Sequence, residues 1–310
     1  MAVPVVLDCD PGHDDAFAIW LAAGHPALRL LAITTVGGNG RVEHTTHNAR
    51  VVCTVAGIRD VPIAAGADGP LVRVLAPAED IHGVNALGGP VLPEPDVELD
   101  PRGAVELLRA VLTESAEPVV VIATGPLTNI ALLLRLHPDV VPKISQIAWM
   151  GGSTARGNVT PYAEFNCWVD PEAAAAVLAC GIPFGMVGLN VTHQALVTPE
   201  VMDRLGAVGN ATAAFGVELL TFFRATYQRA EGMAAPPLHD PVAVALVAEP
   251  DLVRTVHTRV DVELHGTETA GATSVDLHDK LGRPPNARVA LDLDVPRFWA
   301  TLTDALARMR

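Results

Sequence analysis

The stretch "VPVVLDCDPGHDDA", residues 3–16, joins a short apolar run to a loop rich in aspartate and then to a helical pattern. The apolar run at 3–8 is typical of a buried strand, and the pattern that follows predicts a helix from about Asp14 to Ala23. Between them, Pro11 and Gly12 predict a tight turn. A buried strand that leads through a short turn into a helix is the building unit of a parallel α/β sheet.

The same alternation continues through most of the chain. Further strands are predicted at residues 28–36, 61–66, 118–125, 144–152 and 182–190, and helices between them at about 42–57, 101–115, 127–136 and 171–179. Strands that carry Val and Ile on both faces indicate a sheet that is covered by helices on both sides.

From about residue 198 the pattern changes to helices and two late strands. Helices are predicted near 199–205, 211–230, 241–248 and from about 297, and strands at 255–264 and 287–294. We therefore expect residues 1–310 to form a single large α/β domain. Its sheet would be mainly parallel and Rossmann-like, flanked by helices, with a small late antiparallel strand pair.

Composition excludes several classes of function. The formal net charge is −14, with 35 acidic and 21 basic residues, which argues against a nucleic-acid partner. The start of the chain has no basic segment typical of a signal peptide, and no apolar run is long enough to predict a membrane span. The 4 cysteines form no C-x-x-C motif, so reduced thiols in a cytoplasmic protein are expected.

Polar side chains cluster where predicted strands end. Asp8, Asp10, Asn39, Thr124 and Asn190 all lie at or just past the carboxyl end of a strand. Ligands bind at this edge of open parallel sheets, so the residues are candidates for a binding site.

The aspartate loop is the strongest candidate for a metal site. Asp8, Asp10, Asp14 and Asp15 lie within eight positions, and close carboxylates need a cation, a shared proton or strong backbone donors. An oxygen-only ligand set suits calcium or magnesium. The alternative is that Asp14 and Asp15 only stabilise the start of a helix. Further oxygens are available from a backbone carbonyl at the strand end in "TGPLTN" (124–129) and from Asp240, which precedes Pro241 and follows His239.

Several motifs along the chain carry a family resemblance. They are "DCDPGHDDA" (8–16), "GGN" (37–39), "HG" (82–83), "ATGPLTNIA" (123–131), "WMGG" (149–152), "AEFNCWVDPEAA" (163–174), "VGLNVTHQA" (187–195) and "HDP" (239–241). In this order and at this spacing they resemble the inosine-uridine-preferring nucleoside hydrolases over essentially the whole chain.

This resemblance implies a calcium-dependent enzyme that hydrolyses the N-glycosidic bond of ribonucleosides. The implied Ca²⁺ ligands are Asp10, Asp15, the backbone carbonyl of Thr124, and Asp240. Asp10 would also activate a metal-bound water, and the reaction would pass through an oxocarbenium-like transition state. The family forms dimers or tetramers, so a homodimer or homotetramer is expected.

The resemblance also assigns substrate contacts. Ribose hydroxyls would be bound by Asp14, Asn39, Asn158, Glu164 and Asn166, and Met150 would lie under the sugar. His239 would protonate the leaving base or hydrogen-bond to it, and His82 would face the base. Tyr227 is a base-stacking candidate, with packing on its own helix as the alternative. By pattern alone, Glu164 and Asn166 also fit an exposed loop, and His82 fits a loop.

Base preference is left open by the sequence. Residues 227–237 lie where the family has a mobile segment, and Glu231 and Gly232 replace an aromatic residue and an arginine that some members carry there. Broad specificity and pyrimidine preference are both compatible with this change, and the leaving-group acid is unassigned. Ala270 stands where an arginine is common in the family, and this replacement has no functional interpretation.

Two other classes of function remain as alternatives. A non-catalytic nucleoside- or calcium-binding protein would keep the same ligands without turnover. A phosphatase of the haloacid-dehalogenase type also begins with D-x-D after a strand. However, those enzymes have Thr or Val after the second aspartate and a later lysine, whereas here Pro11 follows and Lys143 and Lys280 are the only lysines.

Overall fold

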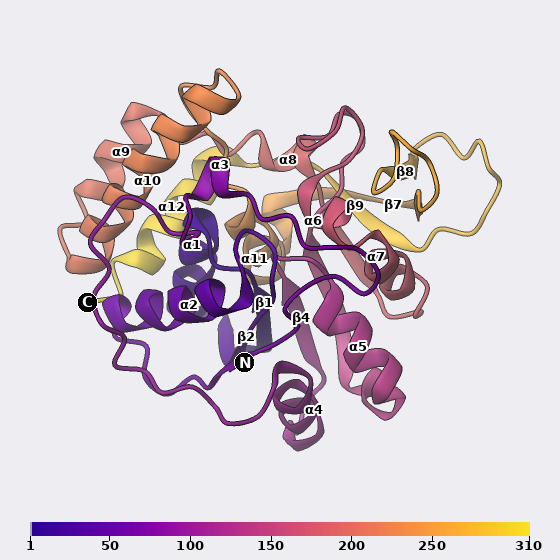
Figure 1. Cartoon of the computed structure of the whole chain (residues 1–310), viewed down its shortest axis with the longest axis horizontal. Helices are drawn as coiled ribbons and strands as arrows, with labels where there is room; N and C mark the ends of the chain where they lie inside the picture. Colours follow the sequence, from indigo (N-terminus) through magenta and orange to yellow (C-terminus); the bar gives the residue numbers. More distant parts are fainter. Residues whose placement is uncertain (1) are drawn as a thin grey trace.

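Nine strands form one sheet in the computed structural model, which describes residues 2–310 (Figure 1). Their spatial order is β3-β2-β1-β4-β5-β6-β9-β7-β8. The parallel part contains β1 (Val3–Cys9), β2 (Leu28–Thr35), β3 (Ile63–Ala65), β4 (Val119–Ala123), β5 (Ile144–Met150) and β6 (Phe184–Val187). The expected single α/β domain is therefore confirmed.

The late strands extend this sheet. β9 (Ala287–Leu293) and β7 (Val253–Val262) are the expected antiparallel pair, but β9 also pairs in parallel with β6, through Gly185 with Arg288 and Met186 with Val289. β8 (Thr273–Asp276) then adds to β7 as an antiparallel edge strand. The pair is thus a continuation of the main sheet. β8 was not predicted, because its four residues are too short and polar for an apolar alternation.

The helices cover both faces of the sheet. They are α1 (His13–Gly24), α2 (Val42–Ala56), α3 (Glu79–His82), α4 (Ala104–Glu114), α5 (Thr128–Leu136), α6 (Phe165–Val169), α7 (Pro171–Leu178), α8 (Leu189–Thr192), α9 (Pro199–Gly206), α10 (Ala211–Ala230), α11 (Asp240–Ala248) and α12 (Val295–Leu306), with 3₁₀ turns at Pro138–Lys143 and Pro250–Leu252. Within residues 2–310, no helix combines the length and apolar character that crossing a bilayer requires.

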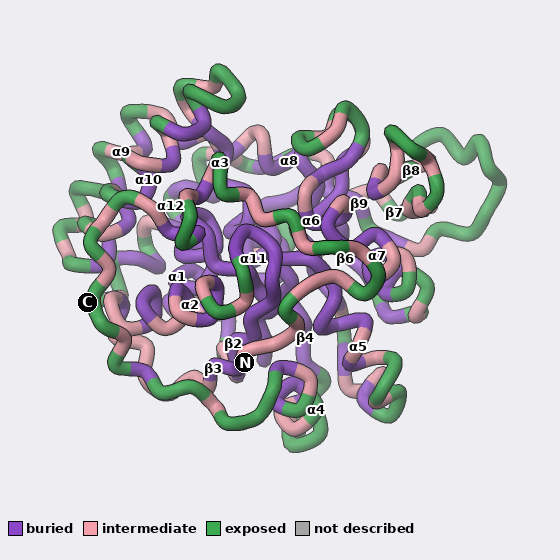
Figure 2. The backbone as a smooth tube through the Cα atoms, in the orientation of Figure 1, coloured by how far each residue is buried: buried purple, intermediate pink, exposed green. Residues whose placement is uncertain are grey.

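Alternation along β1 shows how the two layers are built. Val5, Leu7 and Cys9 join the core with α1, α2, α11 and α12, whereas Val6 joins the core with α4, α5 and α7. Figure 2 shows β4, near the middle of the sheet, buried along its length. Asp8 has the parity of Val6, so its carboxylate points to the α5 side, where Asn129 donates a 2.8 Å hydrogen bond to it. Past β1 the chain turns into α1, which places the aspartate loop at the carboxyl edge of the sheet.

Candidate active site

A cavity of about 660 Å³ opens at the carboxyl edge of the sheet. Almost every residue that the sequence analysis selected lines it, although these residues come from distant parts of the chain. They are Asp14, Asn39, His82, Thr124, Met150, Asn158, Glu164, Asn166, Tyr227, His239 and Asp240. Asp10 and Asp15 do not line the cavity and are fully buried beside it.

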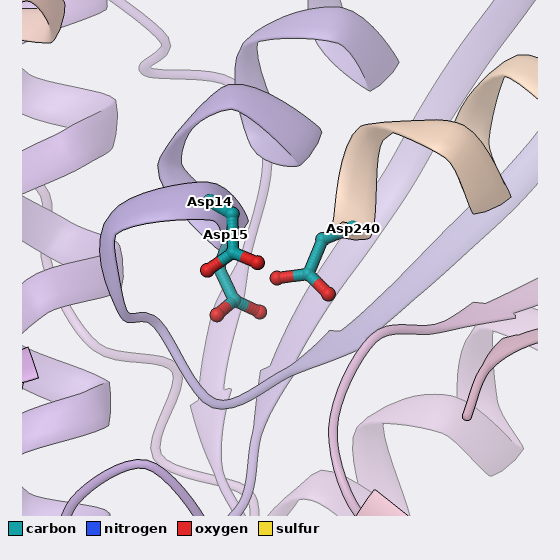
Figure 3. A group of neighbouring side chains, drawn as sticks. All are labelled: Asp14, Asp15 and Asp240. Carbon is teal, nitrogen blue, oxygen red and sulfur yellow. The ribbon is translucent and has the colours of Figure 1, made fainter. Parts of the chain in front are cut away.

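Three carboxylates converge at the base of this site. Asp14 and Asp15 lie in the first turn of α1 and Asp240 begins α11, and one oxygen from each lies within 4.8 Å of the others (Figure 3). Both helices begin here, so their free backbone N–H groups and dipoles partly offset the negative charge. Asp10, which the resemblance names as a metal ligand, is outside this trio. It contacts Asp15, whose Oδ1 accepts a 3.3 Å hydrogen bond from the Asp10 backbone N–H.

Asp10 and Asp15 are held by neutral donors. The Asn39 backbone N–H donates to Asp10 Oδ2 at 2.7 Å, while Asp10 Oδ1 is buried without a partner among the described residues. Asp15 accepts from the Gly12 backbone N–H at 2.9 Å and from Thr124 Oγ1 at 2.8 Å. Gly38 permits this packing, because a Cβ there would lie 2.0 Å from Asp10 Oδ2.

Burial without a cationic partner dominates the electrostatics. It raises the pKa of Asp14 to about 7, with the neighbouring Asp15 charge adding to the effect. Burial and Asp15 likewise raise the pKa of Asp10 well above its ordinary value, and burial and Asp14 do the same for Asp240. Within residues 2–310, no ion pair of an arginine, lysine or histidine includes any of these carboxylates.

The donor set therefore fits a hard divalent cation. It consists of oxygens alone, includes the unpartnered Asp10 Oδ1, and carries negative charge that the protein leaves uncompensated. The Thr124 carbonyl accepts a 2.7 Å hydrogen bond from Asn166 Nδ2 and retains a second lone pair.

One side of the cavity is formed around α6. Glu164 is the N-cap of this helix, and its carboxylate accepts from the backbone N–H groups of Asn166, Cys167 and Gly152 at 2.9, 3.1 and 2.8 Å. Burial raises the pKa of Glu164 to about 7. Glu164 and Asn166 are 2% and 5% exposed, so the alternative of an exposed loop is wrong. Asn158 is exposed at the rim, where Phe165 N donates to its Oδ1 at 2.9 Å.

Met150 and Asn166 connect the α6 side of the cavity to Thr124, beside the carboxylates. Met150 ends β5 and is 3% exposed, and its carbonyl accepts from Asn166 Nδ2 at 2.9 Å. Since Asn166 Nδ2 also donates to Thr124, both of its protons are used. Only Asn166 Oδ1 is free to contact a ligand.

The opposite side carries His239 and Tyr227. The Tyr227 hydroxyl lies 3.0 Å from His239 Nε2, and the Thr192 hydroxyl lies 2.8 Å from His239 Nδ1. Burial lowers the pKa of His239 to about 3 and raises that of the Tyr227 hydroxyl well above 10. Tyr227 also packs edge-on against Phe223 with 4.7 Å between ring centroids, as the packing alternative predicted, while it lines the cavity.

The structure also corrects the setting of His82 and adds residues at or beside the cavity to which the sequence assigned no role. His82 ends the short helix α3 and is buried, so the loop alternative is wrong, and its Nδ1 lies 3.0 Å from Nδ1 of His13. His13, Arg156 and His193 received no role from the sequence. The only available signal for His13 was its place inside the aspartate loop. Its partner His82 lies 69 residues further along the chain, and no local sequence pattern indicates a contact between residues so far apart.

Comparison with known proteins identifies the family. The model of the family "Inosine-uridine preferring nucleoside hydrolase" matches residues 5–300. The chain belongs to this family. Its relatives include the pyrimidine-specific ribonucleoside hydrolases RihA of Photobacterium profundum, 44% identical over 308 residues, and of Escherichia coli O157:H7, 46% identical over 308 residues, each covering 99% of both chains.

Solved structures of nucleoside hydrolases share the fold over nearly the full length. The plant nucleoside hydrolase PpNRh1 superposes with a TM-score of 0.93 at 30% identity, covering 99% of both chains. The purine-preferring ribonucleoside hydrolase from Gardnerella vaginalis gives 0.91 at 30% identity, covering 98% of both. This nucleoside hydrolase therefore belongs to an enzyme class of nucleosidases, and the phosphatase alternative is wrong.

Proposed function

We propose that this nucleoside hydrolase releases the base from pyrimidine ribonucleosides, with one bound Ca²⁺. The observation that carries the reaction is the buried, uncompensated carboxylate group beside a cavity large enough for a nucleoside. The RihA relatives at 44% and 46% identity, named as pyrimidine-specific, support the base preference. A solved relative named for inosine and guanosine is 32% identical.

Calcium would be held by oxygens of Asp10, Asp15 and Asp240 and by the Thr124 carbonyl, with Asp14 alongside. When bound, the ion would lower the pKa of a coordinated water and orient it toward the sugar. These ligands are deprotonated when they bind a cation, so the ion would also offset the charge that burial leaves uncompensated.

Asp10 is the proposed general base. Its Oδ2 is held by the Asn39 N–H, which leaves Oδ1 as the acceptor for a proton. Water attacks C1′ as the C–N bond to the base breaks, Asp10 takes the proton of the water, and the sugar passes through an oxocarbenium-like state.

The ribose hydroxyls would meet acceptors rather than donors near α6. Glu164 already accepts three backbone hydrogen bonds, and a carboxylate has about four lone-pair sites, so one site is left for a hydroxyl. Asn166 offers only its Oδ1. Fixed acceptors of this kind hold the sugar in one orientation during the reaction.

The departing base needs a proton that His239 does not carry as a free acid. Its low pKa keeps it neutral, and a neutral imidazole has a single N–H, which must point to either Thr192 or Tyr227. We therefore assign His239 a positioning role: its N–H donates to the Tyr227 oxygen, so that the Tyr227 hydroxyl proton points to the leaving base as a hydrogen-bond donor. The base leaves as an anion that this hydrogen bond stabilises, and it then takes its proton from solvent water.

A nucleoside panel tests the proposed reaction and the base preference. Uridine and cytidine are expected to be cleaved with kcat/KM at least about tenfold above inosine and adenosine, since one well-placed polar contact is worth about 1.4 kcal/mol or more. Free base and ribose are quantified by chromatography. Equal or faster purine cleavage would contradict the pyrimidine preference alone, and no release from any nucleoside would contradict the reaction.

Uridine 5′-monophosphate is expected to be a poor substrate. Asp14 and Glu164 line the cavity, and a phosphate near these carboxylates would be repelled. We expect kcat/KM at least about a hundredfold below that of uridine, or about 2.7 kcal/mol. 5′-O-methyluridine, which adds bulk without charge, is the matched control. Efficient cleavage of the monophosphate would show that Arg156 or Arg229, which also line the cavity, binds phosphate.

A further inference from the structure

His13 and His82 form a buried pair beside the aspartate loop. Their Nδ1 atoms lie 3.0 Å apart, and both residues are buried. Phe222 stacks on His13 with 5.3 Å between centroids and 3° between planes, and Phe223 stacks on both imidazoles. Gly12 makes room for this pair, because a Cβ at that position would lie 2.5 Å from His82 Nδ1. The relative orientation of the two rings is therefore fixed.

The hydrogen-bond partners of the two rings define which nitrogen of each ring carries its proton. The Gly88 carbonyl, 2.9 Å from His13 Nε2, can only accept, so the proton of His13 is on Nε2. Neither ring has a carboxylate among its hydrogen-bond partners to stabilise a second proton, so each is taken as a neutral imidazole with one N–H. His13 Nδ1 is then a lone pair. A hydrogen bond across 3.0 Å requires a proton on His82 Nδ1, which leaves His82 Nε2 as a lone pair.

This lone pair is available to a ligand. His82 lines the cavity, and its Nε2 makes no hydrogen bond with any residue of 2–310 and is not fully enclosed. The cavity therefore presents a hydrogen-bond acceptor at this point, held in place by a neighbouring ring that does not line the cavity.

We propose that His13 is a positioning residue that fixes the tautomer of His82, so that His82 Nε2 accepts an N–H from the nucleobase. This inference rests on the proposed function for its ligand. N3–H of uridine and the exocyclic amino group of cytidine are such donors. 3-Methyluridine has no N–H at this position, so it lacks the donor.

The backbone N–H of His13 favours the other tautomer of His82. Its N–H lies 3.4 Å from His82 Nδ1 and competes with the His13 ring for that atom. If the ring nitrogens are removed, the backbone N–H is the only partner left, and it requires a lone pair on His82 Nδ1. The proton then moves to Nε2, so the acceptor in the cavity becomes a donor.

Two variants separate the polar role of His13 from its packing. His13→Phe keeps an aromatic ring between the phenylalanines but removes both nitrogens. His13→Gln keeps one acceptor and one donor, which can bond His82 Nδ1–H and the Gly88 carbonyl. The readout is long-range ¹H–¹⁵N NMR of the histidine-labelled, calcium-loaded enzyme, with the His82 signals assigned by their loss in His82→Phe.

We expect His82 to carry its proton on Nδ1 in the wild type and in His13→Gln, and on Nε2 in His13→Phe. The ratio of kcat/KM for uridine over 3-methyluridine should fall at least about tenfold in His13→Phe and stay within about threefold of wild type in His13→Gln. An Nε2–H or doubly protonated His82 in the wild type would overturn the proposal, and that spectrum decides even if His13→Phe does not fold.

The effect of His13 on the His82 tautomer and the contact of His82 with the base are tested separately. A reversed tautomer in His13→Phe with an unchanged uridine ratio would show that His82 does not contact the base. If the wild type cleaves no nucleoside at all, the proposed function fails, whereas the NMR result still accepts or rejects the role of His13.

Discussion

Asp10→Asn is expected to lower kcat for nucleoside hydrolysis by about 10²–10⁴-fold, the range typical of a lost general base, while the protein stays folded. Asparagine has nearly the same shape, and its carbonyl oxygen can still accept the 2.7 Å hydrogen bond from the Asn39 N–H. Its amide nitrogen, however, cannot take a proton from water. The measurement is single-turnover release of uracil from uridine at saturating calcium, with calcium binding followed separately by calorimetry.

Asp170→Asn is the matched control. Asp170 is also fully buried and also accepts hydrogen bonds, from Thr128 Oγ1 at 2.6 Å and Ala173 N at 3.0 Å, but it caps α7 away from the cavity. Asparagine is an equally good cap, so kcat should stay within about twofold of wild type. Near-wild-type turnover in Asp10→Asn with calcium bound would remove Asp10 as the base. Loss of turnover together with loss of calcium binding would assign it to the metal alone.

Local patterns predicted the fold well where an element was long enough to show its period. The 20 residues of α10 were predicted at the observed bounds, and every long helix was found within a few residues. The helices α3, α6 and α8 were missed because each has only 4 or 5 residues, too few for a helical repeat. The parallel pairing of β9 with β6 joins segments about a hundred residues apart, so no local signal indicates it.

The candidate site also has features that a local pattern predicts and features that depend on contacts between distant segments. The aspartates of residues 8–15 share one loop, so their chemistry was visible as a cluster in the sequence. The burial of Glu164 was not, because it depends on backbone donors that only the fold supplies. The contact between His13 and His82 depends on the long segment between β3 and α4 folding back over α1. The sequence therefore identified the reactive groups, whereas the contacts that set their protonation required the structure.

Removal of calcium is expected to abolish turnover and to lower the thermal stability of the enzyme. Binding at a hundred times Kd contributes about 2.7 kcal/mol, and for a domain of this size 1 kcal/mol moves Tm by about 2 °C, so a fall of roughly 5 °C is expected. Uridine hydrolysis and scanning calorimetry are compared before chelation, after chelation and after calcium is restored. Full turnover in chelated protein would contradict a calcium requirement. Recovery with calcium excludes irreversible damage as the cause.

The calcium-dependent gain in Tm should be larger at pH 8 than at pH 5. Without the ion, burial raises the pKa of Asp14 to about 7 and the pKa values of Asp10 and Asp240 well above the ordinary value near 4 that these groups have in the unfolded chain. Between about pH 4 and pH 7 the folded protein therefore binds more protons than the unfolded chain, and its stability falls as pH rises. Calcium binds the deprotonated carboxylates and offsets this loss, while at pH 5 protons compete with it. An equal gain at both pH values would mean that these carboxylates are already deprotonated at pH 5 in the calcium-free enzyme, so that burial does not raise their pKa values as argued.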